Sequence, residues 1–201
     1  MIWSRLLSFL LRGRSIRSFT GMEYAKALEA VKKILENLRG VEGTIHLAPM
    51  GAFVYGSCFI DYFAGYFSGR ELEKGARRPK GGKQYKKFIQ KFMLKYDAHK
   101  LYTDLRCKLV HDFAFNGSYA YSTKFKSEAG SHLKKGKIIL PNGKQTEKTL
   151  LVAENFLEDI DRAAQKYITA LENNESDLRA KAIMRYKLLG SYDGDAKWEK
   201  T

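Results

Sequence analysis

The sequence predicts an all-α fold, a bundle of four to six helices with a small inserted β-hairpin. Apolar residues recur at helical spacing over most of the 201 residues, and one segment is almost wholly apolar. Only residues 118–145 show the alternation typical of strands. We expect one helical domain over 21–190, between a basic and apolar arm (1–20) and a polar tail (191–201).

The first two helices are predicted from a capping signal and from a long apolar run. Thr20 and Glu23 have capping-box spacing ahead of a one-face apolar stripe. The apolar and basic run before them, residues 1–17, is expected to be either a basic amphipathic arm or an extension upstream of a protein that begins at Met22. The apolar run 48–68 is interpreted as a helix buried inside the bundle. A membrane span fits less well, because Asp61 lowers the hydrophobicity and no second such segment follows.

The rest of the chain alternates breaker-rich stretches with helical patterns. A basic loop with Gly and Pro is expected over 69–83, and the hairpin turns at Pro141-Asn142-Gly143. Leu101, Leu105 and Leu109 recur at steps of four in the third helical pattern. The helices expected after the loop are 84–94, 96–114, 149–172 and 176–189.

The charge of the chain indicates its partner more than its fold. There are 36 Lys and Arg against 22 acidic residues, for a net charge of +14. A surface this positive gains free energy by releasing counterions from phosphates, so RNA or another polyanion is the first candidate. An anionic membrane surface, docked through residues 1–17, and a basic protein without such a partner remain alternatives.

Cysteine usage predicts neither disulfides nor a structural metal site. Cys58 and Cys107 lie in apolar contexts and are expected to be buried thiols in a reducing, cytoplasmic compartment. No grouping of Cys and His has metal-ligand spacing, and no acidic cluster suits Mg²⁺, so we expect no metal and no cofactor.

One short motif stands out in the segment YTDLRCKLVHDF, 102–113. Arg106 and His111 are separated by four residues, near the end of a predicted core helix. A second pair of Arg and His, Arg39 and His46, has six residues between its members and falls in a Gly-rich turn before the apolar segment. Imidazole can accept and donate a proton near neutrality, and a guanidinium matches phosphate oxygens, so the pair suits cleavage of a phosphodiester.

This segment resembles the signature of the HEPN family, helical domains marked by Arg, four to six residues, then His. The layout is also similar, with a lone acidic residue, Asp61, on an apolar second helix. The resemblance implies a metal-independent endoribonuclease of toxin or phage-defence type, with an antitoxin as a partner in the first case. The family often has a polar residue just after the Arg, where this chain has Cys107.

Helix geometry adds a condition to this hypothesis. Five residues at about 100° each place Arg106 and His111 about 140° apart on an ideal helix, so they do not share a face. Joint action on one phosphate requires a distortion of the helix or a second subunit. The resemblance implies a homodimer that brings two motifs into one cleft. Asp104 and Asp112 border the pair as candidate supports for the imidazole.

Lysines and arginines in and after the basic loop are candidates for the phosphate backbone, with aromatic residues nearby for base stacking. The predicted nucleic-acid-binding residues are Arg77, Arg78, Lys80, Lys83, Lys86, Lys87 and Lys108. The same composition fits a non-catalytic nucleic-acid-binding or nucleotide-binding helical module. Ion pairs with Asp104 or Asp112 for Arg106, and a helix-terminal cation for His111, are the structural alternatives.

Overall fold

The computed structural model describes residues 21–42, 49–69, 82–112, 117–123, 130–139, 142–173 and 176–189. It is a mostly helical bundle with a small three-stranded sheet. The expected arm 1–20 and tail 191–201 lie outside the described residues, as do Thr20 and residues 70–81 of the basic loop. In the part of the chain that is described, no helix is both long and apolar enough to cross a membrane.

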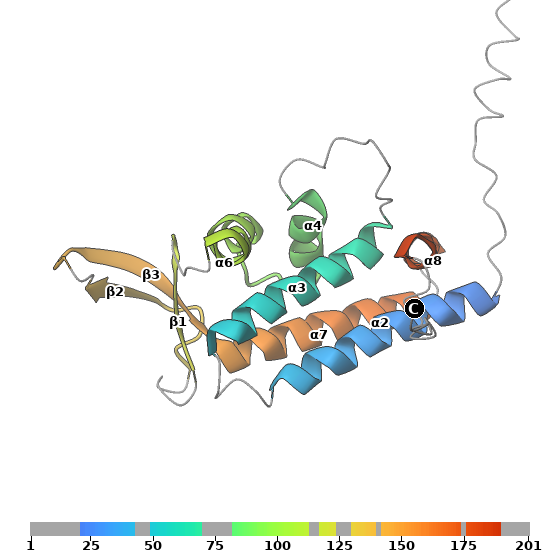
Figure 1. Ribbon diagram of the computed structural model, residues 1–201, viewed down its shortest axis with the longest axis horizontal. Helices are drawn as coiled ribbons and strands as arrows, with labels where there is room; N and C mark the ends of the chain where they lie inside the picture. The colour runs from blue at the N-terminus through green and yellow to red at the C-terminus, as the bar shows by residue number, and fades with distance from the viewer. Residues whose placement is uncertain are drawn as a thin grey trace, which may run out of the picture.

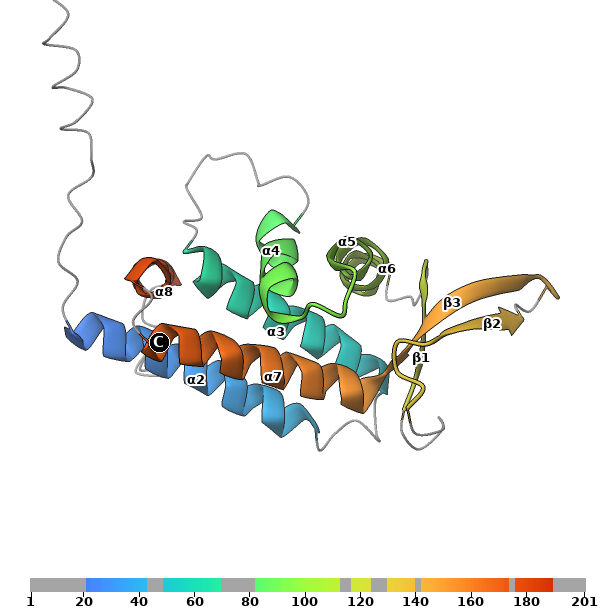
Figure 2. The same cartoon turned by 180° about the vertical axis from the view of Figure 1, so that it is seen from behind.

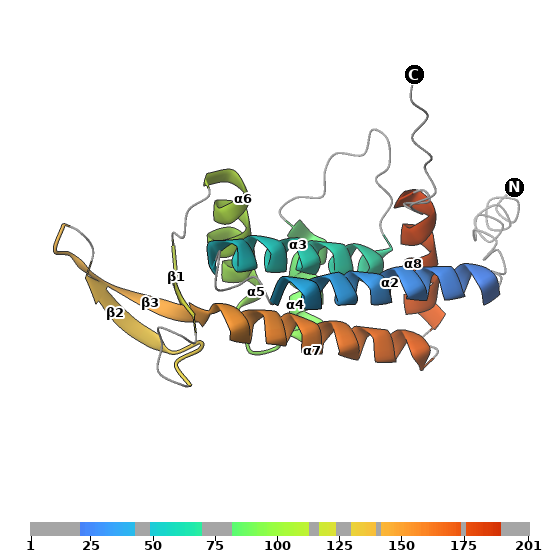
Figure 3. The ribbon, with the colours of Figure 1, turned by 60° about the horizontal axis from the view of Figure 1, so that its bottom comes forward.

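Three long helices form the body of the bundle. Helices α2 (Gly21–Glu42), α3 (Pro49–Ser68) and α7 (Ala153–Glu172) lie alongside one another, as Figures 1 and 3 both show. Their core includes Phe53, Phe63 and Phe156, which are fully buried. The helices of this body are predicted correctly to within a few residues, because α2 and α7 carry apolar stripes several turns long and α3 is apolar over most of its length.

Helix α3 is buried on one side only, which corrects the expectation that it is enclosed by the bundle. Tyr55 and Tyr62 are about half exposed, at 54% and 50%, and Cys58 between them is exposed. On the opposite side, Gly56 lies against Phe156, close enough that an added Cβ would be 2.8 Å from the ring. The small residue therefore sets how closely α3 and α7 pack.

Shorter helices cover one side and one end of this body. Helix α4 (Lys83–Phe92) packs on α3, followed by α5 (Ala98–Lys100), the π-helical segment η2 (Leu101–Cys107) and α6 (Lys108–Asp112), as Figure 2 shows from behind. Helix α8 (Ser176–Leu189) crosses the end of the bundle that is far from the sheet. Arg179 fixes it there, donating from Nε to the Leu171 carbonyl at the end of α7, 2.8 Å away.

The sheet has strand order β1-β3-β2, and is larger than the expected hairpin. Strands β2 (Lys135–Ile139) and β3 (Gln145–Val152) form an antiparallel hairpin with Asn142 and Gly143 in its turn, and it extends beyond the expected range of 118–145. Strand β1 (Tyr119–Ser122) pairs parallel to β3, with Tyr119 opposite Thr149. The sheet thus continues to Val152, and α7 begins at Ala153 instead of the predicted 149.

Candidate functional site

Arg106, the first residue of the predicted pair, is held by a carboxylate of the neighbouring helix. Its Nε donates to Oδ2 of Asp61 at 2.9 Å, and the two side chains are 25% and 32% exposed. Asp61 lies in the middle of α3, whereas Arg106 belongs to the last turn of η2. Among the described residues, the two terminal nitrogens of this guanidinium form no hydrogen bond. They remain available to an oxyanion.

The ion pair keeps the guanidinium charged in a half-buried position. Burial alone would lower the pKa of Arg106, but the charge and the hydrogen bond of Asp61 raise it above its ordinary value. For Asp61, burial raises the pKa more than the guanidinium lowers it. Loss of Arg106 would therefore leave a partly buried carboxylate without its counter-ion, at a cost in stability.

Tyr102 connects this pair to α4. The Arg106 Cζ lies 5.8 Å from the centre of the Tyr102 ring, and the Lys86 Nζ lies 5.6 Å from it. Both distances are within cation–π range, so one ring contacts two cations. Gly82 at the start of α4 touches the same ring, because an added Cβ there would come within 2.0 Å of it. Lys86 and Arg106 are thereby brought to one surface.

The helix that carries the motif is not a regular α-helix. Residues 101–107 form a π-helical segment, which follows Asp97, whose carboxylate caps the amides of His99 and Lys100. Leu101, Leu105 and Leu109 are all buried, as the predicted stripe requires. One-turn π segments are frequent at functional sites, since the wider turn redirects the side chains that follow.

His111, the second residue of the pair, is exposed in the last turn of α6. Within the described residues, no hydrogen bond joins it to Arg106, which is turned towards α3. In the described part of the chain Arg106 is therefore held by Asp61, and not by a hydrogen bond with His111. Asp112 ends α6, and its side chain lies outside the described part.

Asp104, expected beside the imidazole, has a different role. Its two oxygens accept from the Thr103 hydroxyl at 2.8 Å and from the Ser118 amide at 3.0 Å. Burial raises the pKa of Asp104, but these hydrogen bonds lower it further, so it ends below its ordinary value. Gly117, with φ 78°, lies directly against the carboxylate. Asp104 thus fastens the start of β1 to the motif helix.

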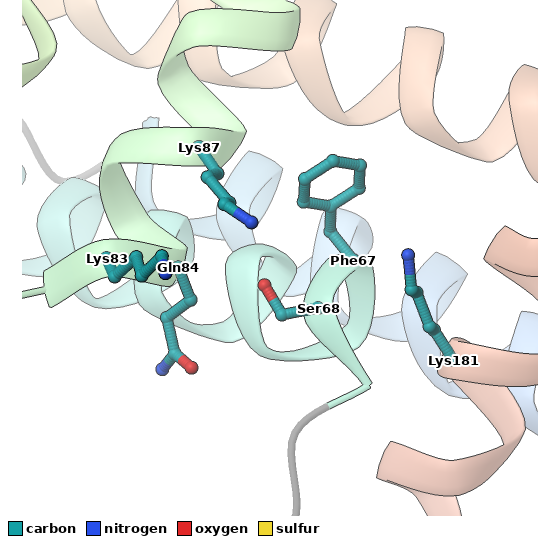
Figure 4. Close-up of a pocket in the computed structure, with 6 residues that line it drawn as sticks. All are labelled: Phe67, Ser68, Lys83, Gln84, Lys87 and Lys181. Carbon is teal, nitrogen blue, oxygen red and sulfur yellow. The ribbon is translucent and has the colours of Figure 1, made fainter. Parts of the chain in front are cut away.

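The predicted nucleic-acid-binding residues fall into three groups. Lys83 and Lys87 line a pocket at the start of α4, together with residues of α3 and α8 (Figure 4). Lys86 lies on Tyr102, and Lys108 is exposed at the start of α6. The third group, Arg77, Arg78 and Lys80, lies outside the described residues.

A buried polar cluster that the sequence did not reveal joins the sheet to the bundle. The Tyr96 hydroxyl donates to Asp159 Oδ2 at 2.6 Å and lies 2.8 Å from His132 Nε2. His132 Nδ1 accepts the Val152 amide at 3.0 Å, so Nε2 carries the ring proton and points to Tyr96. Because these residues are far apart in sequence, only the polar residue at a core position of α7, Asp159, could have signalled the cluster.

Both cysteines belong to the described part of the chain. Cys58 is exposed and Cys107 is half-buried, so the prediction of two buried thiols is wrong for Cys58; both are free. Burial and the nearby Asp61 raise the pKa of the Cys58 thiol, which lies one turn from that carboxylate. In the described ranges, no group of three His, Cys, Asp or Glu side chains is arranged to hold a metal ion.

Comparisons with protein-family models, with curated proteins and with solved structures give no match to this chain.

Proposed function

We propose that this protein is a metal-independent endoribonuclease of the HEPN type, in which Arg106 binds the scissile phosphate and His111 transfers a proton. The observation that carries the proposal is the Arg106 guanidinium, held through Nε by Asp61 while its terminal nitrogens remain uncommitted. A fork oriented by a neighbouring carboxylate is prepared for bidentate contact with phosphate oxygens. The net charge of +14 favours a polyanionic substrate.

The reaction that suits these groups is attack by the RNA itself. The 2′-hydroxyl oxygen forms a bond to phosphorus as it loses its proton to an imidazole, and the bond from phosphorus to the 5′-oxygen breaks. The leaving 5′-oxygen takes up a proton from a water molecule, which gives a 2′,3′-cyclic phosphate and a free 5′-hydroxyl. The guanidinium stabilises the charge that grows on the non-bridging oxygens.

Two copies of the chain would supply the complete site. Arg106 is turned towards α3 and His111 is exposed, and among the described residues no hydrogen bond joins the two side chains. A two-fold arrangement would place His111 of the partner subunit beside Arg106. We therefore propose a cytoplasmic homodimer of toxin or phage-defence type, which in the first case an antitoxin would hold inactive.

Incubation with RNA and with the all-deoxy analogue in EDTA tests the proposal. We expect cleavage of RNA only, and a loss of at least about a hundredfold in the His111→Ala variant, since general acid–base catalysis contributes that much. His99→Ala removes another exposed imidazole from the same segment and should cleave normally. Cleavage of the deoxy strand, or an active His111→Ala variant, would overturn the mechanism.

A non-catalytic nucleic-acid-binding or nucleotide-binding module is the second candidate, favoured by the partial neutralisation of Arg106 by Asp61. It predicts RNA binding that weakens steeply with salt, no products, and undiminished binding by His111→Ala.

A further inference from the structure

A small pocket opens where the end of α3, the start of α4 and the middle of α8 meet. Figure 4 shows its lining residues, which are Phe67, Ser68, Lys83, Gln84, Lys87 and Lys181. Its volume is about 250 Å³, below the roughly 300–1,000 Å³ of sites that enclose a whole ligand. A pocket of this size would hold one end of a molecule.

Three lysines from two helices line the pocket. Lys83 and Lys87 are one turn apart on α4, and neither has a carboxylate partner among the described residues. Lys181 comes from α8 and forms an ion pair with Asp177, at 2.5 Å from Nζ to Oδ2. Among the described residues, three cations and one carboxylate leave an excess of two positive charges around the space.

The backbone at this point allows the close approach of α8 and leaves amides of α4 uncapped. Gly69 has φ 61°, and an added Cβ would come within 2.6 Å of the Lys181 Cα, so glycine permits the contact that brings Lys181 to the pocket. Gly82 precedes α4 and provides no side-chain cap, so the first amides of α4 add a positive dipole end. Ser68 and Gln84 contribute neutral donors to the lining.

A purely structural role of the lysines would be to neutralise the carbonyl end of α3. A helix end carries only about half an elementary charge, and the opposite half-charge at the start of α4 offsets it. The excess of about two positive charges is therefore unexplained by the helix ends. A phosphomonoester, with a charge of about −1.5 to −2 at neutral pH, would balance it.

We propose that this pocket binds a phosphomonoester group, either the terminal phosphate of an RNA strand or the phosphate of a free nucleotide. Ser68 is seven residues beyond Asp61 on α3, or about 10 Å along the helix axis. A strand end held here therefore lies about 10 Å, along α3, from the carboxylate that holds Arg106. The binding itself does not require that the protein cleave RNA, so it stands independently of the proposed nuclease activity.

Binding measurements with matched pairs of ligands test the proposal, in the His111→Ala background so that RNA stays intact. Two pairs compare an RNA strand that has a phosphate at one end, first the 5′ end and then the 3′ end, with the same strand without it. A third pair compares adenosine monophosphate with adenosine. We expect at least one phosphorylated member to bind about tenfold more tightly, since a hydrogen bond to a charged group contributes about that much. Tighter binding of a phosphorylated RNA strand than of its unphosphorylated partner identifies the strand end as the source of the phosphate. Tighter binding of adenosine monophosphate than of adenosine, with no such difference between the strands, identifies the free nucleotide.

The double variant Lys83→Gln/Lys87→Gln should lose the preference. The control Lys33→Gln/Lys166→Gln removes the same charge from exposed positions of α2 and α7 and should keep it. Unfolding midpoints of both variants verify that the fold is intact, and Lys181→Gln provides a second test from α8. Equal binding within every pair by the His111→Ala protein, or a preference that survives in the Lys83→Gln/Lys87→Gln variant, would overturn the proposal.

Discussion

Replacement of Asp159 by Asn should destabilise the protein by about 2 kcal/mol at pH 7. The Asp159 side chain is 5% exposed and takes Lys95 and Arg162 as partners at 2.6 Å each, besides Tyr96. The Lys95 and Arg162 side chains are 50% and 59% exposed. Water can replace much of their interaction with the lost carboxylate charge, so these two ion pairs contribute less than buried ones would. The Asn side chain keeps one acceptor oxygen in place of two. The cost is therefore that of one or two charge-assisted hydrogen bonds.

The effect should depend on pH in a defined direction. Burial raises the pKa of Asp159, but hydrogen bonds from His132, Lys95 and Tyr96 lower it further, so the folded value is below the ordinary one. The carboxylate therefore stabilises the fold above about pH 4, and this contribution is lost as the pH falls towards the folded value. The difference between wild type and Asp159→Asn should shrink over that interval.

Urea unfolding followed by circular dichroism at pH 7, 5, 4 and 3 measures both quantities. Asp177→Asn is the matched control, because that carboxylate is 77% exposed and its ion pair with Lys181 lies within one helix. We expect this control to differ from wild type by less than about 0.5 kcal/mol. A difference for Asp159→Asn that is as small as the control's, or that stays constant down to pH 3, would refute the reasoning.

Three glycine substitutions follow from the packing and are read from the same unfolding curves. Gly56→Ala should cost about 1–3 kcal/mol, because its Cβ would overlap the Phe156 ring. Gly40→Ala, with open space around it in α2, should instead stabilise by about 0.5–1 kcal/mol. Gly117→Ala should cost at least about 1 kcal/mol, since its φ of 78° strains an L residue. An equal effect at Gly40 and Gly56 would contradict the account of α3 packing.

The parts of the fold that the sequence predicts are those set by local pattern. The ends of α8 and of α3 agree with the predictions at Leu189 and Ser68, and in the sequence a glycine follows each of them. The start of α7 was placed four residues too early. Residues 149–152 are apolar enough to suit a helix or a strand, and only their pairing with β1 and β2 decides for the strand.

The candidate site was only partly predictable for the same reason. Arg106 and His111 were found from their spacing, and Asp61 from its isolation in an apolar helix, but the ion pair between Arg106 and Asp61 joins positions 45 residues apart. The apolar residues of the π-helical segment 101–107 have the same spacing as those of an α-helix, so the sequence does not distinguish the two. Lys181 reaches the lysine pocket only because α8 folds back across α3, which no local pattern indicates.

The claim that Arg106 and His111 act on one phosphate from two subunits is tested most directly by mixing two inactive variants. Arg106→Ala and His111→Ala, unfolded together and refolded as an equal mixture, should recover about a quarter of wild-type RNA cleavage, because half of the dimers are mixed and each mixed dimer has one complete site. A mixture no more active than its separate components, beside an active wild type, would contradict the claim.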